Sequence, residues 1–419
     1  MRRLARGFPW FSAVSIGAAM LVFAAAEVAQ AGINGWTSHG PYGAGNINAL
    51  VIDPTTPSTL YAGTDRGVFQ SADSGGSWSV KTTGLGDLTV AGLAIDPITP
   101  NVLYAGTYRD GVFQSTNSGG SWNAVTTGLS ALSTGALAID PTTPSTLYAG
   151  TFDGAFQSTN SAASWVATGL RSTYVTALAI DPITPSTLYA VTAFQGIFQS
   201  LDSGGTWSAV NNGLSDVDAN SIFALAIDPI NPSTLYAGIS GPISGYEGVF
   251  QSTSSGGSWR ALNMGLSNLA VHALAIDPTT SSTLYAGIYG GGVFQSTDSG
   301  GSWSALTTGL STLDITALAI DPITPSTLYA GTRDGEVFTI QQVAVCGGDC
   351  NLDGEVTVDE LLAMVDIALG DAGIVSCPAG DAEHDNQITI DEIIAAVQHA
   401  LNGCGARMIS FIPPTRGAD

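Results

Sequence analysis

A repeated motif constrains the fold of this chain more than any other feature of its sequence. The tripeptide Ile-Asp-Pro occurs seven times at intervals of 41 to 49 residues, with its aspartates at Asp53, Asp96, Asp140, Asp181, Asp228, Asp277 and Asp321. The consensus of the surrounding unit reads A-L-A-I-D-P, then T-L-Y-A-G, then G-V-F-Q-S, then a polar turn that ends in Trp. A repeat of this length with four short strand-like runs is typical of a β-propeller blade.

The four runs predict strands A to D of each blade. Strand A is the Ala-Leu-Ala-Ile run, whose small residues suit the crowded centre of a ring. The proline after each aspartate ends strand A, because proline cannot donate a hydrogen bond to a neighbouring strand. Strands B and C are rich in β-branched and aromatic residues, which suit half-buried strands. Strand D starts at the Trp of the polar turn.

The polar turn between strands C and D follows the pattern S-x-D-x-G-x-[ST]-W, with Asn or Ser in place of Asp in some copies. Its six copies are Ser71–Trp78, Ser115–Trp122, Ser158–Trp165, Ser200–Trp207, Ser252–Trp259 and Ser296–Trp303. A short polar side chain can bond the turn backbone, Gly adopts positive φ, and Trp anchors the hairpin in a core. The pattern resembles the Asp-box, or BNR, repeat of sialidases, sortilin-type receptors, xyloglucanase-like glycosidases and photosystem assembly propellers. The resemblance implies a fold rather than an activity.

Seven A strands and six Asp-boxes indicate how the ring closes. The seventh unit ends at 335–340 without a polar turn or a strand D, whereas Gly35-Trp36-Thr37-Ser38 near the N-terminus resembles the start of strand D. We therefore predict that the N-terminal strand completes blade seven and removes an exposed sheet edge. Seven of the eight Trp residues then give one per blade. The predicted architecture is mainly β, a seven-bladed propeller over residues 32–342.

The N-terminus predicts export. Residues 1–31 contain Arg2, Arg3 and Arg6, then an apolar run and a small-residue cleavage site, which is the pattern of a secretory signal peptide. A membrane anchor is the alternative, but Glu27 ends the apolar run. The net charge of −23 argues against nucleic acid and anionic membranes as partners. We expect a secreted, extracellular or cell-surface protein, or a periplasmic one, with no membrane span after cleavage.

Two acidic segments near the C-terminus match the twelve-residue EF-hand loop. The first copy supplies ligand positions from Asp349, Asn351, Asp353, Glu355, Thr357 and Glu360. The second copy supplies them from Asp381, Glu383, Asp385, Gln387 and Glu392, with Asn386 where the loop normally has Gly. Each loop is followed by a segment with apolar residues at helical spacing. The sequence therefore predicts two Ca²⁺ sites.

The acidic composition of this segment also favours calcium. Residues 346–404 contain twelve carboxylates and no Lys or Arg, so folding without a cation would be electrostatically costly. The order of loop and then helix, repeated twice, resembles a dockerin, the paired calcium module that binds cohesin domains. That resemblance implies a cohesin-like partner, but Glu360 and Glu392 at position 12, Val358 and Ile390 at position 10, and the cysteines depart from it. The tail over 405–419 is predicted to be disordered.

All four cysteines lie in this C-terminal part of the chain. They are Cys346, Cys350, Cys377 and Cys404. An even, clustered set in an exported chain predicts two disulfides. A bond from Cys404 to either Cys350 or Cys346 would join the ends of the module, and the sequence does not choose between them.

The sequence gives little support for catalysis. The repeated aspartates of the Asp-Pro turns and Asp-boxes recur in every blade or in several, so we interpret them as turn residues. Sialidases need an arginine triad, and xyloglucanase-like enzymes use two acids across a cleft between two propellers, whereas this chain predicts one propeller. The isolated His39 and His272 are interpreted as structural. The carboxylates outside the repeat form no convincing pair, although a glycosidase needs one; they are Asp87, Asp216, Asp218, Glu247 and Asp314.

Binding is more consistent with the pattern of variation. Strand direction places the A–B and C–D turns on one face and the B–C and D–A turns on the other. The second face varies between blades, and its B–C turns carry the candidate rim residues Arg66, Tyr108, Arg109, Phe152, Phe194, Tyr246, Tyr289 and Arg333. The D–A turns add Tyr174, Asp218 and Asp314. We expect a non-catalytic propeller that binds an extracellular glycan or protein there; the alternative is a glycosidase carrying the same calcium module.

Overall fold

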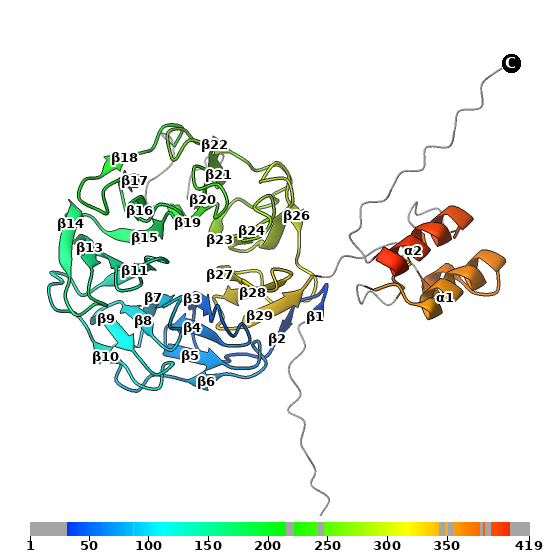
Figure 1. Cartoon of the computed structure of the whole chain (residues 1–419), viewed down its shortest axis with the longest axis horizontal. Helices are drawn as coiled ribbons and strands as arrows, with labels where there is room; N and C mark the ends of the chain where they lie inside the picture. Colours follow the sequence, from blue (N-terminus) through cyan, green and yellow to red (C-terminus); the bar gives the residue numbers. More distant parts are fainter. Residues whose placement is uncertain are drawn as a thin grey trace, which may run out of the picture.

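The chain forms a seven-bladed β-propeller followed by two helices (Figure 1). This computed structural model describes residues 32–86, 88–214, 222–241, 247–342, 348–350, 355–377, 380–381 and 387–402. The predicted signal peptide and the predicted disordered tail lie outside these ranges. The mainly β fold class predicted from the repeats is confirmed.

Each blade is an antiparallel sheet whose strands run outward from the centre of the ring (Figure 1). The innermost A strands are β3(Ile47–Ile52), β7(Val90–Ile95), β11(Thr134–Ile139), β15(Val175–Ile180), β19(Ile222–Ile227), β23(Val271–Ile276) and β27(Ile315–Ile320). The B strands are β4(Leu60–Thr64), β8(Leu103–Thr107), β12(Leu147–Thr151), β16(Leu188–Thr192), β20(Leu235–Ile239), β24(Leu284–Ile288) and β28(Thr327–Thr332). The C strands are β5(Gly67–Ser71), β9(Gly111–Ser115), β13(Gly154–Ser158), β17(Gly196–Ser200), β21(Gly248–Ser252), β25(Gly292–Ser296) and β29(Val337–Gln341).

The outer D strands are short, except in blade three. They are β6(Ser79–Val80), β10(Asn123–Ala124), β14(Val166–Arg171), β18(Ser208–Ala209), β22(Arg260–Ala261) and β26(Ser304–Ala305). Blade seven takes its fourth strand from the N-terminus, because β2(Thr37–Ser38) pairs antiparallel with β29, Thr37 opposite Thr339. In addition, β1(Gly32–Ile33) pairs with β29 in parallel. The N-terminal strand thus closes the ring and leaves blade seven without an unpaired C strand.

Four of the six Asp-box Trp residues connect their blade to the one before it, whereas Trp207 donates to Gly204 of its own hairpin. Trp122 of blade two donates its indole N–H to the carbonyl oxygen of Lys81 in blade one at 2.9 Å. Trp36 does the same at the closure, donating to the carbonyl oxygen of Leu306 in blade six at 2.7 Å. Gly84 in the T-G-L segment sits so near this junction that an added Cβ would lie 2.2 Å from the Trp122 carbonyl oxygen. In those four blades the Asp-box Trp therefore holds neighbouring blades together as well as its own hairpin.

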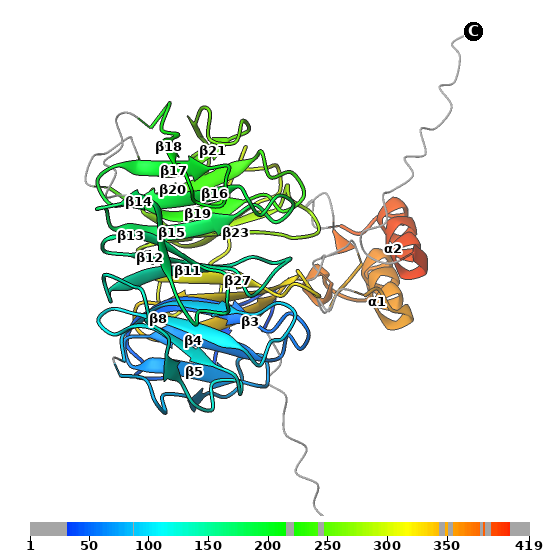
Figure 2. The same cartoon turned by 60° about the vertical axis from the view of Figure 1, so that its left-hand side comes forward.

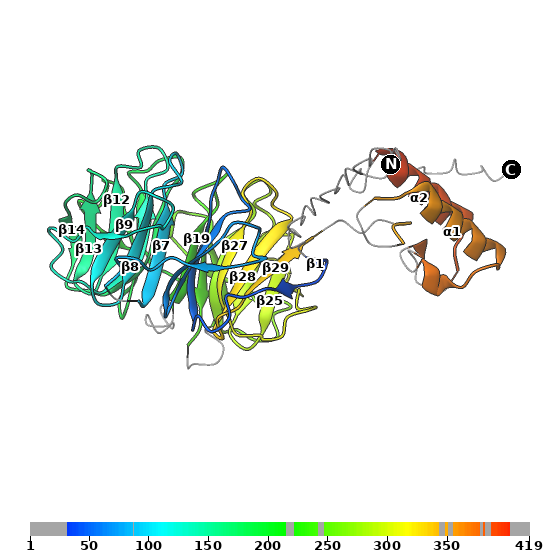
Figure 3. The ribbon, with the colours of Figure 1, turned by 90° about the horizontal axis from the view of Figure 1, so that it is seen from below.

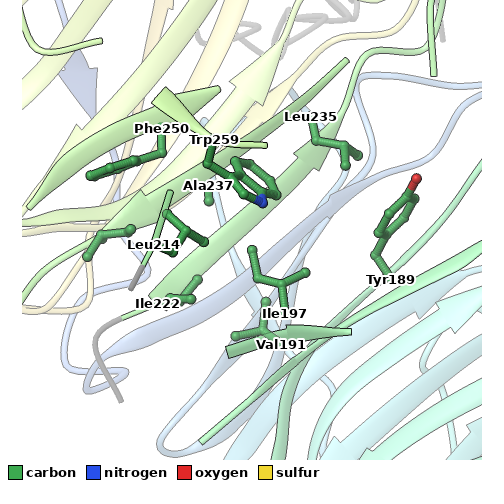
Figure 4. Packing of buried hydrophobic residues seen from close by; sticks show 10 residues of the cluster. Tyr189, Val191, Ile197, Leu214, Ile222, Leu235, Ala237, Phe250 and Trp259 are labelled. Carbon is green, nitrogen blue, oxygen red and sulfur yellow. The ribbon is translucent and has the colours of Figure 1, made fainter. Parts of the chain in front are cut away.

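The cores lie between neighbouring blades. Figure 4 shows the core between blades four and five, where Trp259 and Phe250 of blade five pack with Val191 and Ile197 of blade four. Each strand B also buries a Tyr, and Tyr285 is 2% exposed. The Tyr hydroxyl accepts a hydrogen bond from a Gln of strand C in blades one to six, at 2.9 to 3.2 Å. These repeated cores between blades account for the near-identical apolar residues of the repeats.

The repeated acids are turn residues, as predicted. Asp53 Oδ1 accepts hydrogen bonds from the backbone N–H groups of Thr55 and Thr56 at 2.8 and 3.0 Å. The other six Asp-Pro turns repeat this pair of bonds. In the Asp-box of blade six, hydrogen bonds from the Ser302 backbone, the Ser296 hydroxyl and the Ser302 hydroxyl lower the pKa of Asp298 to about 2.

Beyond blade seven the described chain forms two helices, α1(Val358–Leu369) and α2(Ile390–Asn402), joined through the short 3₁₀ helix η2(Ile374–Ser376). Both helices lie outside the ring, on the side of β1 and β29 (Figures 1, 2 and 3). Their shared core contains Met364, Ile367 and Ala396. In the described part of the chain, no helix combines the length and apolar character needed to cross a membrane.

Candidate functional site

The start of strand A is irregular in every blade. In blade one, Ile47 pairs with Thr64 and Ala49 pairs with Gly63, so Asn48 has no partner on strand B. The same shift occurs after the first residue of all seven A strands. Such a β-bulge kinks the strand locally and re-aims the extra side chain. Since the end of strand B leads into the B–C turn, the seven bulges lie on the face of the B–C and D–A turns.

The bulged residues are also where the A strands differ most. The residue before the bulge is always β-branched and at most 4% exposed. The fourth residue is always Leu and the sixth is always Ile. The bulged second residue varies in size and polarity around the ring, from blade one to blade seven as Asn48, Ala91, Gly135, Thr176, Phe223, His272 and Thr316. We call these seven residues the bulge ring.

One side of the bulge ring carries a stack of aromatic rings. The rings of Phe223 and His272 are nearly parallel, with centroids 4.4 Å apart and planes at 7°. Tyr289, directly after β24, stacks on the other side of His272 with centroids 5.3 Å apart. The Arg333 guanidinium lies 5.4 Å from the Tyr289 ring centroid and donates to its hydroxyl. The stack spans blades five to seven, and Phe223 remains 49% exposed.

This stack lines a cavity of about 630 Å³. The size is within the range of small-ligand sites. The remaining lining side chains are amides and hydroxyls from blades one, five and seven, namely Asn46, Asn48, Ser240 and Thr316. None of the residues that line the described cavity is a carboxylate. The cavity therefore combines an aromatic wall with neutral hydrogen-bonding groups.

The polar wall in blade one is held in place by its own hydrogen bonds. Asn48 Nδ2 donates to Asp65 Oδ1 at 3.0 Å and to the Val90 carbonyl oxygen at 3.1 Å. Asn46 Nδ2 donates to Asn48 Oδ1 at 2.5 Å. Asn46 Oδ1 is a buried acceptor with no hydrogen-bond partner among the described protein groups. A ligand hydroxyl or N–H in the cavity could satisfy it, because buried polar atoms normally have a partner.

His272 is held as a neutral ring. Burial lowers its pKa, the carboxylate of Asp314 acts in the opposite direction, and the Arg333 guanidinium lowers the pKa further. His272 Nε2 lies 3.2 Å from the Ser240 hydroxyl. A neutral imidazole between two aromatic rings is suited to stacking and to a fixed hydrogen bond. The interpretation of His272 as an isolated structural histidine missed its place in the cavity.

The predicted rim residues lie at the turns around this face. Tyr108, Phe152 and Phe194 are 54%, 65% and 75% exposed, so their rings are not buried between blades. Arg66, Arg109 and Arg333 are exposed, and Tyr289 is half-buried. Only Tyr289 and Arg333 of the predicted set line the cavity. Tyr246 lies outside the described residues.

The sequence reasoning missed six lining residues, namely Asn46, Asn48, Phe223, Ser240, His272 and Thr316. A signal for four of them was present, because Asn48, Phe223, His272 and Thr316 occupy the one position at which the A-strand copies differ strongly. Of the acids considered for catalysis, Glu247 and Asp314 are described, and neither lines the cavity. Asp314 lies in the D–A turn next to it, where its carbonyl oxygen accepts from the Arg333 backbone at 3.0 Å. Asp87, Asp216 and Asp218 lie outside the described residues.

The carboxylates at both ends of the two predicted calcium loops are described and buried. Asp349 and Asp381 at position 1 are 0% and 7% exposed, and Glu360 and Glu392 at position 12 are 7% and 8% exposed. Glu360 Oε2 also accepts from the backbone and hydroxyl of Thr357, at 2.7 and 2.9 Å, forming a capping box at the start of α1. Glu355 and Gln387 at position 7 are described too, but positions 3 and 5 of both loops (Asn351, Asp353, Glu383 and Asp385) lie outside the described residues.

The chemistry of these side chains is suited to binding a calcium ion. Their donors are hard oxygens, and four carboxylates are buried in a segment whose sequence has no Lys or Arg. Within the described ranges, no three His, Cys, Asp or Glu side chains come together as a metal site. Val356 and Ile388 at position 8 share the core of the module, as expected for paired loops, although neither lies in a strand.

The disulfide of the described chain rules out one of the two pairings that the sequence left open for Cys404. Cys350 is bonded to Cys377, so a bond from Cys350 to Cys404 is wrong. After α1, the chain returns through η2 and brings Cys377 into the core beside the first loop, where it is fully buried. Because this return depends on the packing of α1, cysteine spacing could not reveal it. Cys346 and Cys404 lie outside the described residues.

Comparison with known proteins supports the fold. No family model matches the chain, and no curated protein matches it. Among solved structures, it is similar to the GH74 xyloglucanase from Xanthomonas campestris, with TM-score 0.58, 20% identity and coverage of 72% of this chain and 52% of that one. The extracellular domain of BT4673 from B. thetaiotaomicron gives TM-score 0.57, 16% identity and coverage of 73% and 39%. YCF48 bound to D1 peptide gives TM-score 0.55, 13% identity and coverage of 74% of this chain and 99% of that one.

The chain spans about half the length of the xyloglucanase that it resembles. At such identities the similarity establishes the propeller fold, and function must be argued from the site.

Proposed function

We propose that this protein is a secreted, non-catalytic propeller that binds an extracellular ligand in the cavity of the bulge ring, and that the ligand is a glycan. The observation that carries the proposal is the stack of Phe223, His272 and Tyr289 facing amide and hydroxyl groups in one cavity. A sugar ring has an apolar face for an aromatic platform and hydroxyls for the polar wall. A protein ligand is less well matched, because the cavity is small and concave.

The alternative is a glycosidase. The fold similarity to a GH74 xyloglucanase is the observation in its favour. Glycoside hydrolysis ordinarily requires two carboxyl groups about 5 to 10 Å apart. No carboxylate lines the described cavity, so binding explains it better.

The C-terminal module is proposed to bind two calcium ions and to attach the protein to a partner. The buried carboxylates at the loop ends support the first part. The second part is supported by matching apolar stripes, because Val358, Leu362 and Leu369 on α1 and Ile390, Ile394 and Leu401 on α2 are all at least 50% exposed. Exposed apolar stripes of this kind favour a protein partner, such as a cohesin-like domain. The Cys350–Cys377 disulfide supports an oxidising, extracellular location.

The test is glycan capture by the intact protein, with calcium or with a chelator. We would use an array of plant, bacterial and animal glycans that includes xyloglucan. The variant Phe223→Thr places in blade five the residue that blades four and seven have at that position. Ile98→Thr is the matched control, since Ile98 is 65% exposed on the opposite face and blades one, three and six have Thr there.

The expected result is calcium-independent capture that Phe223→Thr weakens at least about tenfold and Ile98→Thr leaves unchanged. New reducing ends released from the captured glycan would favour the glycosidase instead. Absence of capture from every glycan would refute the proposed function of the propeller.

A further inference from the structure

The bulge ring has large side chains on one side and small side chains on the other. Phe223 and His272 place large rings at the mouth in blades five and six, and Tyr289 with Arg333 extends this wall to blade seven. Blade one continues the wall with its hydrogen-bonded asparagines. The bulge residues of blades two and three are Ala91 and Gly135, whose side chains are too small to form a wall. Blade four adds the small Thr176, so the side formed by blades two to four leaves the most room for a ligand to extend from the cavity.

An aromatic path begins on the side with small side chains. A Cβ on Gly135 would lie 2.9 Å from Tyr174 Oη, so the hydroxyl of Tyr174 occupies the space left by the missing side chain. Tyr174 comes from the D–A turn before blade four and is half-buried. Its ring lies 5.3 Å from the ring of Phe152, at a tilt of 34°. Phe152 lies in the B–C turn of blade three and is 65% exposed. The path thus leads from the centre of the ring to its rim.

We propose that the ligand is a linear oligosaccharide bound by its end. Its terminal ring lies in the cavity against Phe223, and the chain leaves over Gly135 so that a following ring contacts Tyr174 and Phe152. This inference rests on the proposed glycan-binding function. We infer an end because all residues that line the described cavity come from blades five, six, seven and one, and the interior of a polymer would have to continue across that side.

The two aromatic positions then depend differently on ligand length. Phe223 contacts the terminal ring of every ligand, but Phe152 contacts only a ligand long enough to reach the rim. The probes are glucose and cello-oligosaccharides of two to six glucose units, measured by titration calorimetry with the intact protein. The wild-type protein is expected to gain affinity with length and then reach a plateau.

Phe152→Ala is expected to weaken the longer oligosaccharides about two- to tenfold, the usual value of an aromatic contact, and to leave the shortest bound ligand unchanged. Phe223→Thr is expected to weaken all lengths. A uniform effect of Phe152→Ala, or none, would overturn the proposed path. A wild-type protein that captures another glycan of the array but binds no cello-oligosaccharide would overturn the inference while leaving the glycan function in place.

A second measurement tests binding by the end. Hydroxyethylcellulose is cut partially by an endoglucanase, and the amount of protein bound per gram is measured before and after cutting. Capacity that rises in proportion to the number of chain ends supports the inference. Capacity that is unchanged or lower would show that chain interiors are bound, and would overturn it.

Discussion

One pair of substitutions measures how much the Trp36 indole hydrogen bond at the ring closure contributes to stability. Trp36 is 3% exposed and donates to the Leu306 carbonyl oxygen, so it connects the N-terminal strand of blade seven to blade six. Trp78 is the equivalent residue of blade one, on the other side of the closure. Its buried Nε1 has no hydrogen-bond partner among the described groups. The two residues therefore share chemistry and place in the blade, but Trp36 makes the indole bond and is buried, whereas Trp78 makes no such bond and is partly buried.

The expected magnitudes follow from this difference. Trp36→Phe keeps a buried aromatic ring but removes the donor and leaves the Leu306 carbonyl oxygen unpaired, at a cost of about 1–3 kcal/mol. Trp78→Phe removes a donor that is already unsatisfied, which offsets part of the lost ring burial. We expect Trp36→Phe to lower the free energy of unfolding by about 1–2 kcal/mol more than Trp78→Phe. Trp36→Ala, which also loses the ring, should cost about 3–5 kcal/mol.

The measurement is urea denaturation of the intact protein with calcium present, followed by circular dichroism so that the changed Trp does not alter the signal. The linear dependence of the unfolding free energy on urea gives the difference between variants. Equal destabilisation by Trp36→Phe and Trp78→Phe would refute the reasoning that the indole bond stabilises the closure. A larger loss for Trp78→Phe would show that ring burial alone determines the effect.

Three further predictions concern alkaline pH, backbone strain and the disulfide. Burial raises the pKa of Tyr285 to about 12, because the folded state favours the neutral hydroxyl. The contribution of this neutral Tyr to the unfolding free energy is complete below pH 10 and is lost as pH rises from 10 through 12. A urea midpoint that is unchanged over that range would contradict the prediction. Phe194 has φ of +76° although it is 75% exposed, so Phe194→Asn should raise the free energy of unfolding by about 1 kcal/mol, whereas Tyr108→Asn should change it by less than about 0.5 kcal/mol. Cys350 and Cys377 are 27 residues apart, and replacing both by Ala should destabilise the helical module by about 3–4 kcal/mol. The measurement is the loss of helical circular dichroism in urea, and an unchanged unfolding free energy would show that the apolar core of the module is sufficient for its stability.

The repeats were sufficient to predict the ring and its closure. Each blade has the same apolar residues because each blade buries the same faces, so counting strands also counted blades. Trp36, the one Trp after the predicted signal peptide that lies outside an Asp-box, indicated that the N-terminus supplies the missing strand, and the pairing of Thr37 with Thr339 shows this. The turn role of the repeated acids was also predictable, since a motif present in every blade is explained by the blade.

The cavity could not be predicted in the same way. Phe223, His272 and Tyr289 are separated by 17 to 66 residues in the sequence and meet only because blades five and six are neighbours. Reading His272 alone favoured a structural role. The rim aromatics were selected from turns, whereas the central side chains come from bulges inside strands. A bulge depends on how strand A pairs with strand B, which is set by tertiary packing.

The sequence by itself determined the number of blades and the closing strand, because these follow from periodicity, and its ligand spacing predicts the two calcium loops. Only the tertiary structure decided which side chains share the central cavity and that Cys350 bonds Cys377. Both results depend on where separate segments meet in space. Repetition fixes what each blade is, but the register of the strands fixes where its one variable side chain points.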